Sequence, residues 1–175
     1  MQRNMAQKVL RFHVLANSDS REDQALKLKV RDQVGTLMAE KLKDADSLEE
    51  SERIVKANLN LIENCAADVI SAEGYAYPVS AALENCIFPE KTYGTYTFPG
   101  GVYEALRVVI GSGEGHNWWC VMYPNLCFTG SMYEIDETEN EKKLRQVLTP
   151  EEYQTVMENK EYKVQFRILK FLNRD

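Results

Sequence analysis

The sequence lacks any long uncharged apolar run, and this absence limits how the chain can meet a membrane. A membrane-spanning helix needs about 18 or more consecutive apolar residues, and none of the 175 positions begins such a run. No signal peptide is visible either, because the opening MQRNMAQK is polar and the apolar stretch 9–16 contains Arg11 and His13. We therefore expect no membrane span. At face value the chain is cytosolic, unless an export segment has been trimmed from its start.

A positive charge excess is also missing. The chain carries 21 Lys and Arg against 27 Asp and Glu, a formal net charge of -6. Proteins that bind DNA or RNA present clustered cations to the phosphates, and a polybasic membrane anchor needs the same kind of cluster. The charge therefore argues against nucleic acid as a partner and against electrostatic attachment to a lipid surface.

Histidine is scarce, and the cysteine spacing of a zinc ribbon is absent. There are 2 histidines, and the 4 cysteines lie at Cys65, Cys86, Cys120 and Cys127 with no CxxC pair. We predict no metal site and no cofactor. Four cysteines allow three disulfide pairings. In an oxidising compartment Cys120 and Cys127 could close a short loop, which would stabilise the fold by about 2 to 3 kcal/mol.

What is present at the N-terminal side reads as one strand and two long helices. Residues 9–16 are rich in β-branched and aromatic side chains, which favours a strand. Potential N-caps at 17–20 then precede a helical stripe formed by Leu26, Val30, Val34 and Met38. A capping box at 47–50 opens a second helix that is predicted to run to Gly74.

The second half changes character and predicts an antiparallel sheet. Residues 75–83, 91–98, 102–110 and 118–123 look like strands separated by turn residues, an arrangement typical of a meander. The acidic run 134–143 is predicted to be a loop, and a capping box at 149–152 to open a short helix. Residues 163–172 fit a last strand or a helix, and the alternation of Val164, Phe166 and Ile168 favours the strand. The fold class is therefore a single α+β domain over 1–175. It combines a mainly antiparallel sheet, two long N-terminal helices on one face and a short C-terminal helix. Residues 1–8 are expected to be disordered or an artificial addition.

The densest aromatic segment is the first candidate for a partner surface. Neighbouring residues on a strand point to opposite faces, so Trp118 and Trp119 cannot both face the same core. One of them lies under a loop or at the surface, where tryptophan often dominates interface energetics; burial on both faces of a covered sheet explains the pair equally well. The candidate residues are Trp118, Trp119, Tyr123, Pro124 and Asn125.

A second candidate lies where the first strand meets the first long helix. Asn17, Ser18 and Asp19 cluster at a helix start, and helix N-termini attract anions. Helix capping explains the same residues without a ligand and is the preferred interpretation. The loop GSGEG at 111–115 lacks the ending of a P-loop and is predicted to be a hairpin turn.

A thiol enzyme is the candidate from another class. Cys120 could act as the nucleophile and His13 as its base if the two side chains came within hydrogen-bond reach. His13 lies in an apolar strand, where a structural histidine is more common. No signature of a known cysteine protease surrounds Cys120.

Two long strings resemble the stage II sporulation protein R family of endospore-forming bacteria. These are RFHVLANSDSREDQALKLKVRD at 11–32 and FPEKTYGTYTFPGGVYEALRVVIGSGEGHNWWCVMYPNLCF at 88–128, and the resemblance covers about residues 9 to 128. It implies a messenger rather than an enzyme, and it brings no catalytic residues with it. Family members are made in the forespore and exported into the space between the forespore and mother-cell membranes. There they activate a membrane-embedded aspartic protease, which removes the pro-segment of the early mother-cell sigma factor.

Overall fold

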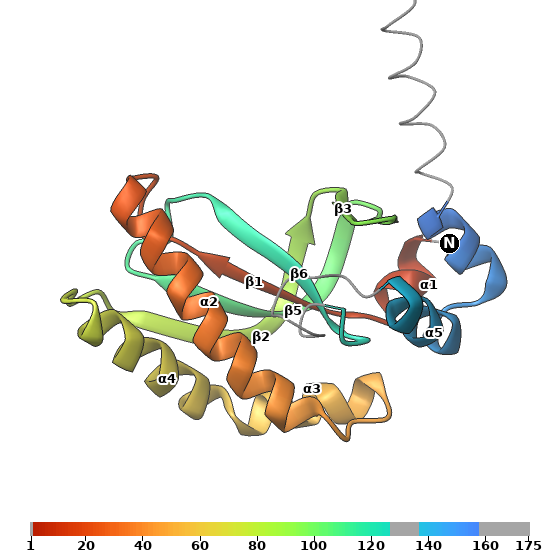
Figure 1. Cartoon of the computed structure of the whole chain (residues 1–175), viewed down its shortest axis with the longest axis horizontal. Coiled ribbons are helices and arrows are strands. Elements are labelled where there is room, and N and C mark those ends of the chain that lie inside the picture. The colour runs from red at the N-terminus through yellow and green to blue at the C-terminus, as the bar shows by residue number, and fades with distance from the viewer. Residues whose placement is uncertain (1, 127–136, 158–175) are drawn as a thin grey trace, which may run out of the picture.

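The structure, a computed structural model, describes residues 2–126 and 137–157. A four-stranded sheet lies at its centre, three helices cover one face, and a small hairpin with short helices covers part of the other (Figure 1). The elements are, in order, α1 (Gln2–Ala6), β1 (Leu10–Leu15), α2 (Arg21–Leu42), α3 (Leu48–Ala57), α4 (Leu59–Ala72), β2 (Val79–Phe88), β3 (Lys91–Tyr93), β4 (Tyr96–Phe98), β5 (Gly101–Ile110), β6 (Asn117–Tyr123) and α5 (Glu137–Val147).

The first strand lies in the middle of the sheet. The strand order is β2-β5-β1-β6, with β1 parallel to β5 and antiparallel to β6. The sheet is mainly antiparallel, as predicted, but the prediction of a simple meander is wrong. All six residues of β1 are buried, Arg11 and His13 included, as expected for a central strand that is covered on both faces.

The long helices pack on one face, as predicted. Ser20 caps α2 by accepting a hydrogen bond from the backbone N of Asp23. The predicted stripe of α2 is buried against Phe12 of β1 and Leu106 of β5 in the first core. The predicted second helix is two helices, because the chain leaves helical geometry at Asn58 (φ -113°, ψ 10°), where the side-chain Nδ2 donates to the carbonyl of Ile54 at 2.7 Å.

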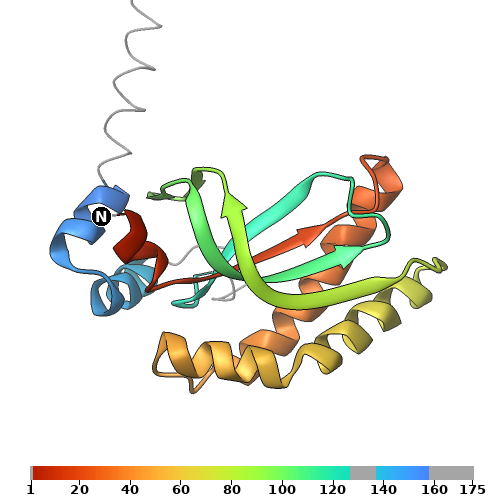
Figure 2. The ribbon, with the colours of Figure 1, turned by 180° about the vertical axis from the view of Figure 1, so that it is seen from behind.

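A second core lies on the opposite face of the sheet. The hairpin β3–β4, α1 and α5 contribute to it together with the helix at 150–157. That helix has the predicted capping box, because Thr149 and Glu152 exchange side-chain to backbone hydrogen bonds. Figure 2 shows this group at the end of the sheet away from the α2 N-terminus.

Two predictions differ from the structure at this second core. Helix α1 lies where disorder was one of the two expectations, and its Met5 is fully buried; the other expectation, an artificial addition, stays a prediction. Helix α5 replaces the predicted acidic loop, because Leu144 and Leu148 anchor its end in the second core. The predicted strand at 163–172 lies outside the described residues. Within 2–126 and 137–157, no helix has both the length and the apolar character needed to cross a membrane.

Candidate functional site

The β5–β6 loop is fastened to the turn that follows β1. Since β1 lies between β5 and β6, this connection has to cross the end of β1 and is not the predicted hairpin turn. Ser112 donates its backbone N–H to Asn17 Oδ1 at 3.0 Å and its hydroxyl to the Asn17 carbonyl at 2.8 Å. The Gly115 N–H donates to the Ala16 carbonyl at 2.9 Å. We call residues 17–19 together with 111–116 the turn–loop clamp.

Glycines make the close approach of the clamp feasible. Gly111 has φ +59°, and a Cβ there would lie 2.1 Å from Asn17 Oδ1. A Cβ on Gly115 would lie 2.2 Å from the backbone oxygen of Ser18. Side chains do not tolerate such distances, so the contact between these two segments, which are far apart in the chain, favours glycine at 111 and 115.

The predicted capping residues have different roles around the buried carboxylate of Asp23. Ser20 is the N-cap, which confirms capping there. Ser18 and Asn17 instead donate to Asp23 Oδ2 at 2.5 and 2.9 Å. These hydrogen bonds, that from Ser18 foremost, hold the pKa of Asp23 below its ordinary value. Asp23, in the first turn of α2, therefore holds the preceding segment 17–18 in place by these hydrogen bonds.

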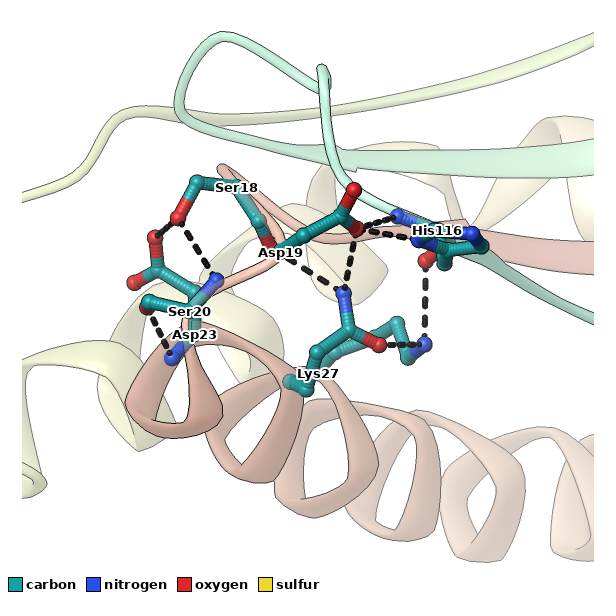
Figure 3. A network of polar contacts seen from close by, with 7 residues as sticks. Ser18, Asp19, Ser20, Asp23, Lys27 and His116 are labelled. Atoms are coloured by element: carbon teal, nitrogen blue, oxygen red, sulfur yellow. Dashed lines mark hydrogen bonds and ion pairs between the residues drawn. The ribbon is translucent and has the colours of Figure 1, made fainter.

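Asp19 and His116 face solvent across the clamp (Figure 3). Asp19 accepts a hydrogen bond from the His116 backbone N–H at 2.7 Å and also contacts the imidazole Nδ1. The imidazole hydrogen bond is the main cause of the lowered pKa of Asp19. The His116 side chain is 82% exposed, and Lys27 of α2 donates to the His116 carbonyl at 2.9 Å. The clamp thus presents an anionic and an imidazole group on a fixed backbone.

Trp118 extends this surface along the first face of the sheet. The Arg31 guanidinium lies 5.0 Å from the Trp118 ring centre, and the Phe12 ring meets it edge-on at 5.5 Å. Leu28 lies one turn before Arg31 on the same side of α2 and is 40% exposed. We call Trp118, Arg31, Leu28, Asp19 and His116 the Trp118 surface. It contains Asp19 of the second predicted group and one of the two tryptophans, whereas Asn17 and Ser18 bind Asp23 instead.

Trp119 lies on the other face of the sheet. It stacks on His13 at 5.0 Å between ring centres and meets Phe88 at 4.7 Å. The two tryptophans therefore point to opposite faces, as strand alternation predicts. Trp119 is half-buried against the second core, so it does not join the Trp118 surface.

The remaining predicted residues lie at the opposite end of β6. Tyr123, Pro124 and Asn125 line a pocket of about 310 Å³ between β6, the α2–α3 connection and α5. The Tyr123 hydroxyl donates to the Asp46 carbonyl at 3.1 Å, and Lys143 donates to the Asn125 carbonyl at 3.4 Å. The predicted aromatic surface is thus divided among three places.

The proposed thiol and base do not meet. In the β1–β6 register His13 is opposite Trp119, and Cys120 is opposite Phe12. Their side chains therefore point to opposite faces of the sheet. Burial, with the nearby charges of Arg107 and Arg11, lowers the pKa of His13 to about 4. Cys127, the predicted disulfide partner of Cys120, lies outside the described residues, while Cys65 and Cys86 are free thiols.

Sequence reasoning missed several residues that the structure brings into prominence. Arg31 on α2 and His116 on the loop belong to the Trp118 surface, and the buried Lys27 of α2 holds the His116 backbone beneath it. A usable signal existed for Lys27, since a cation stands beside Leu26 on the apolar stripe of a predicted helix. Within the described ranges, no three His, Cys, Asp or Glu residues are placed to hold a metal ion.

Arg11 was also missed and is fully buried in the second core. Its guanidinium lies 4.4 Å from the Phe88 ring centre and 4.8 Å from that of Tyr103. It donates to the Cys120 carbonyl at 3.1 Å and to the Tyr93 hydroxyl at 2.9 Å. Burial lowers the pKa of Arg11. The ring faces and oxygen atoms take the place of the carboxylate that a buried arginine usually has.

Comparison with known proteins identifies the family of the chain. The family model described as stage II sporulation protein R matches residues 6–133, a range that includes β1, α2 and both parts of the clamp. The stage II sporulation protein R of Bacillus subtilis (strain 168) is 40% identical over 119 residues, which are 68% of this chain and 53% of that protein. The chain thus spans about half the length of this curated relative. No solved structure matches. The chain belongs to the stage II sporulation protein R family.

Proposed function

We propose that this protein is a signal from the forespore to the mother cell during sporulation. In this proposal it is exported into the space between the two membranes, where it activates a membrane-embedded aspartic protease. The protease then cleaves the pro-form of the early mother-cell sigma factor. Membership of the stage II sporulation protein R family supports the link to sporulation.

The Trp118 surface is the observation that carries a binding role. It combines a tryptophan and an arginine, the residue types that most often dominate interface energies. The Arg31 contact and the clamp restrict the conformations of this surface before any partner arrives. A pre-ordered surface loses less conformational entropy on binding. For activation, the surface must bind the active state of the protease more tightly than the inactive state.

A thiol hydrolase acting at the cell wall is the rival function. It requires Cys120 and His13 to form a hydrogen-bonded pair, and their side chains lie on opposite faces of β1 and β6. The geometry therefore favours the non-enzymatic proposal.

Reconstitution in a bacterium that does not sporulate tests the signalling role. The protease and the sigma precursor are co-expressed with this chain, with or without an export signal, and precursor cleavage is followed on a gel. We expect cleavage only with the exported chain. Folded chain in the export compartment without cleavage would refute the proposal.

The same assay tests the Trp118 surface. Trp118→Ala and Leu28→Ala should reduce cleavage while circular dichroism shows a retained fold. Leu61→Ala is the matched control, because Leu61 on α4 is 41% exposed and Leu28 is 40% exposed. If the Leu28 and Leu61 variants lose cleavage equally, or if Trp118→Ala retains it, the surface is not the binding site.

A further inference from the structure

The outer edge of β2 is an unpaired strand edge. β2 is at the end of the strand order and pairs with β5 along ten residues without a bulge. The Ala81 N–H points away from β5, since it donates to the Glu63 carboxylate of α4 at 2.8 Å. Backbone directions alternate along an antiparallel strand, so the N–H and C=O groups of Leu83, Asn85 and Ile87 also point outward. In the described part of the chain, Ala81 alone of these has a partner on that side.

The second half of β2 also leaves the helical layer. Figure 2 shows β2 bending away from α3 and α4 toward its C-terminal end. Ile87 is 78% exposed there, and Val102, its register partner on β5, is 54% exposed. Natural edge strands are normally protected by lysine, proline or a bulge. None of these lies within β2, whose one charged residue is Glu84.

A carboxylate pair flanks the same edge. Glu104 is opposite Asn85 in the register, and Glu52 of α3 lies beside Glu104. Lys56 is the cation paired with Glu104, at 3.8 Å. The pKa of Glu52 is raised to about 7, so near neutral pH Glu52 is partly protonated and the pair, with Lys56, carries less than one net negative charge. This charge grows as the pH rises above 7, and it attracts a cation.

We propose that the β2 edge binds an extended segment of a partner protein, which adds a fifth strand to the sheet. The segment carries an apolar residue that packs on Ile87 and Val102, and a basic residue two positions away that meets Glu104 and Glu52. Residues two apart lie on the same face of a strand, so this spacing fits both contacts. Backbone hydrogen bonds supply affinity, and the two side chains supply selectivity.

A second copy of the chain fits this edge less well. β2 contains no basic residue, so pairing of β2 with β2 of another copy would bring no cation besides Lys56 to the carboxylate pair. The proposal is independent of the Trp118 surface and of the signalling role. It concerns a different edge of the sheet, and its test uses no protease.

The probe is a capped synthetic peptide, Thr-Val-Thr-Lys-Thr-Val-Thr, which reads the same in both chain directions. It is titrated to millimolar concentration into the isotope-labelled full chain, and amide shifts and hydrogen exchange are followed by NMR. We expect the Leu83, Asn85 and Ile87 amides to shift and to exchange more slowly. No change at these amides, or changes elsewhere only, would overturn the proposal. Slow exchange of these amides without peptide, together with a concentration-dependent dimer, would also overturn it, in favour of self-association.

Variants separate the backbone contribution from the charge contribution. Asn85→Pro removes an outward N–H but no β2–β5 hydrogen bond, so it should abolish binding in a folded protein. Should that variant fail to fold, Ile87→Lys at a largely exposed position should have the same effect. Glu104→Gln should weaken the lysine peptide by about two- to fivefold and leave a glutamine-containing peptide unchanged. Equal binding of both peptides by the native chain would exclude the basic residue from the proposal.

Discussion

Arg31 on α2 holds its guanidinium 5.0 Å from the ring centre of Trp118 on β6. The contact joins a helix to an edge strand of the sheet and lies two residues beyond His116, which Lys27 binds from the same helix. Helix α2 therefore fixes both the start of β6 and the aromatic side chain that this strand presents.

Replacing Arg31 should separate signalling from stability. A partly exposed cation–π contact contributes about 0.5 to 1 kcal/mol, so Arg31→Ala should lower the free energy of unfolding by that amount in urea titrations. Precursor cleavage in the reconstituted system should fall much further, because Trp118 loses its fixed position. Arg31→Lys retains a cation, so its precursor cleavage should lie between that of the native chain and that of Arg31→Ala. Native-level cleavage by Arg31→Ala would remove Arg31 from the binding surface.

A methyl group at Gly115 should strain the clamp. Its Cβ would meet the Ser18 carbonyl oxygen at 2.2 Å, and overpacking of this kind costs about 2 kcal/mol. Gly74→Ala is the control, because Gly74 has φ +83° but no atom within 4 Å of its Cβ. Its cost should be about 1 kcal/mol, from the backbone conformation alone. Thermal unfolding of both variants measures the difference, and equal costs would mean that the loop moves freely away from the turn.

Glu52 should make stability fall between weakly acid and neutral pH. Burial, together with Glu104, raises the pKa of Glu52 from 4.5 to about 7. The folded state therefore binds the proton more tightly than the unfolded state, and stability decreases as the pH rises from about 4.5 through about 7. Urea titrations at several pH values should show this decrease in the native chain and a smaller one in Glu52→Gln. An identical pH dependence in both would contradict the carboxylate pairing.

Export into an oxidising compartment should join Cys120 to Cys127. Peptide mapping by mass spectrometry under non-reducing conditions should find this bond. Cys127→Ser should then cost about 2 to 3 kcal/mol in the oxidised protein and little in the reduced one. Cys65→Ser, at a free thiol, is the control and should leave the mapped bond intact. A different pairing, or none in protein taken from the export compartment, would refute the prediction.

Local patterns predicted most elements, and long-range pairing explains the failures. The stripe from Leu26 to Met38 identified α2, and Ser20 identified its start. Each of these signals consists of residues that are close together in the sequence. The position of β1 between β5 and β6 depends on contacts across about 100 residues, which periodicity does not contain. The clamp was missed for the same reason: GSGEG reads as a turn until Asn17 is beside it. Asn58 interrupts a helix whose apolar pattern continues on both sides.

The central place of β1 also determines when the sheet can close during synthesis. β1 ends at Leu15, while both of its neighbours, β5 and β6, are made only after residue 100. Until Tyr123 has left the ribosome, β1 cannot pair with strands on both of its edges. Its apolar side chains cannot yet be buried on both faces of the sheet. Closure of such distant segments is slow compared with helix formation. A nascent chain of this design therefore remains open for most of its synthesis, with its first strand accessible to whatever binds unfolded polypeptides.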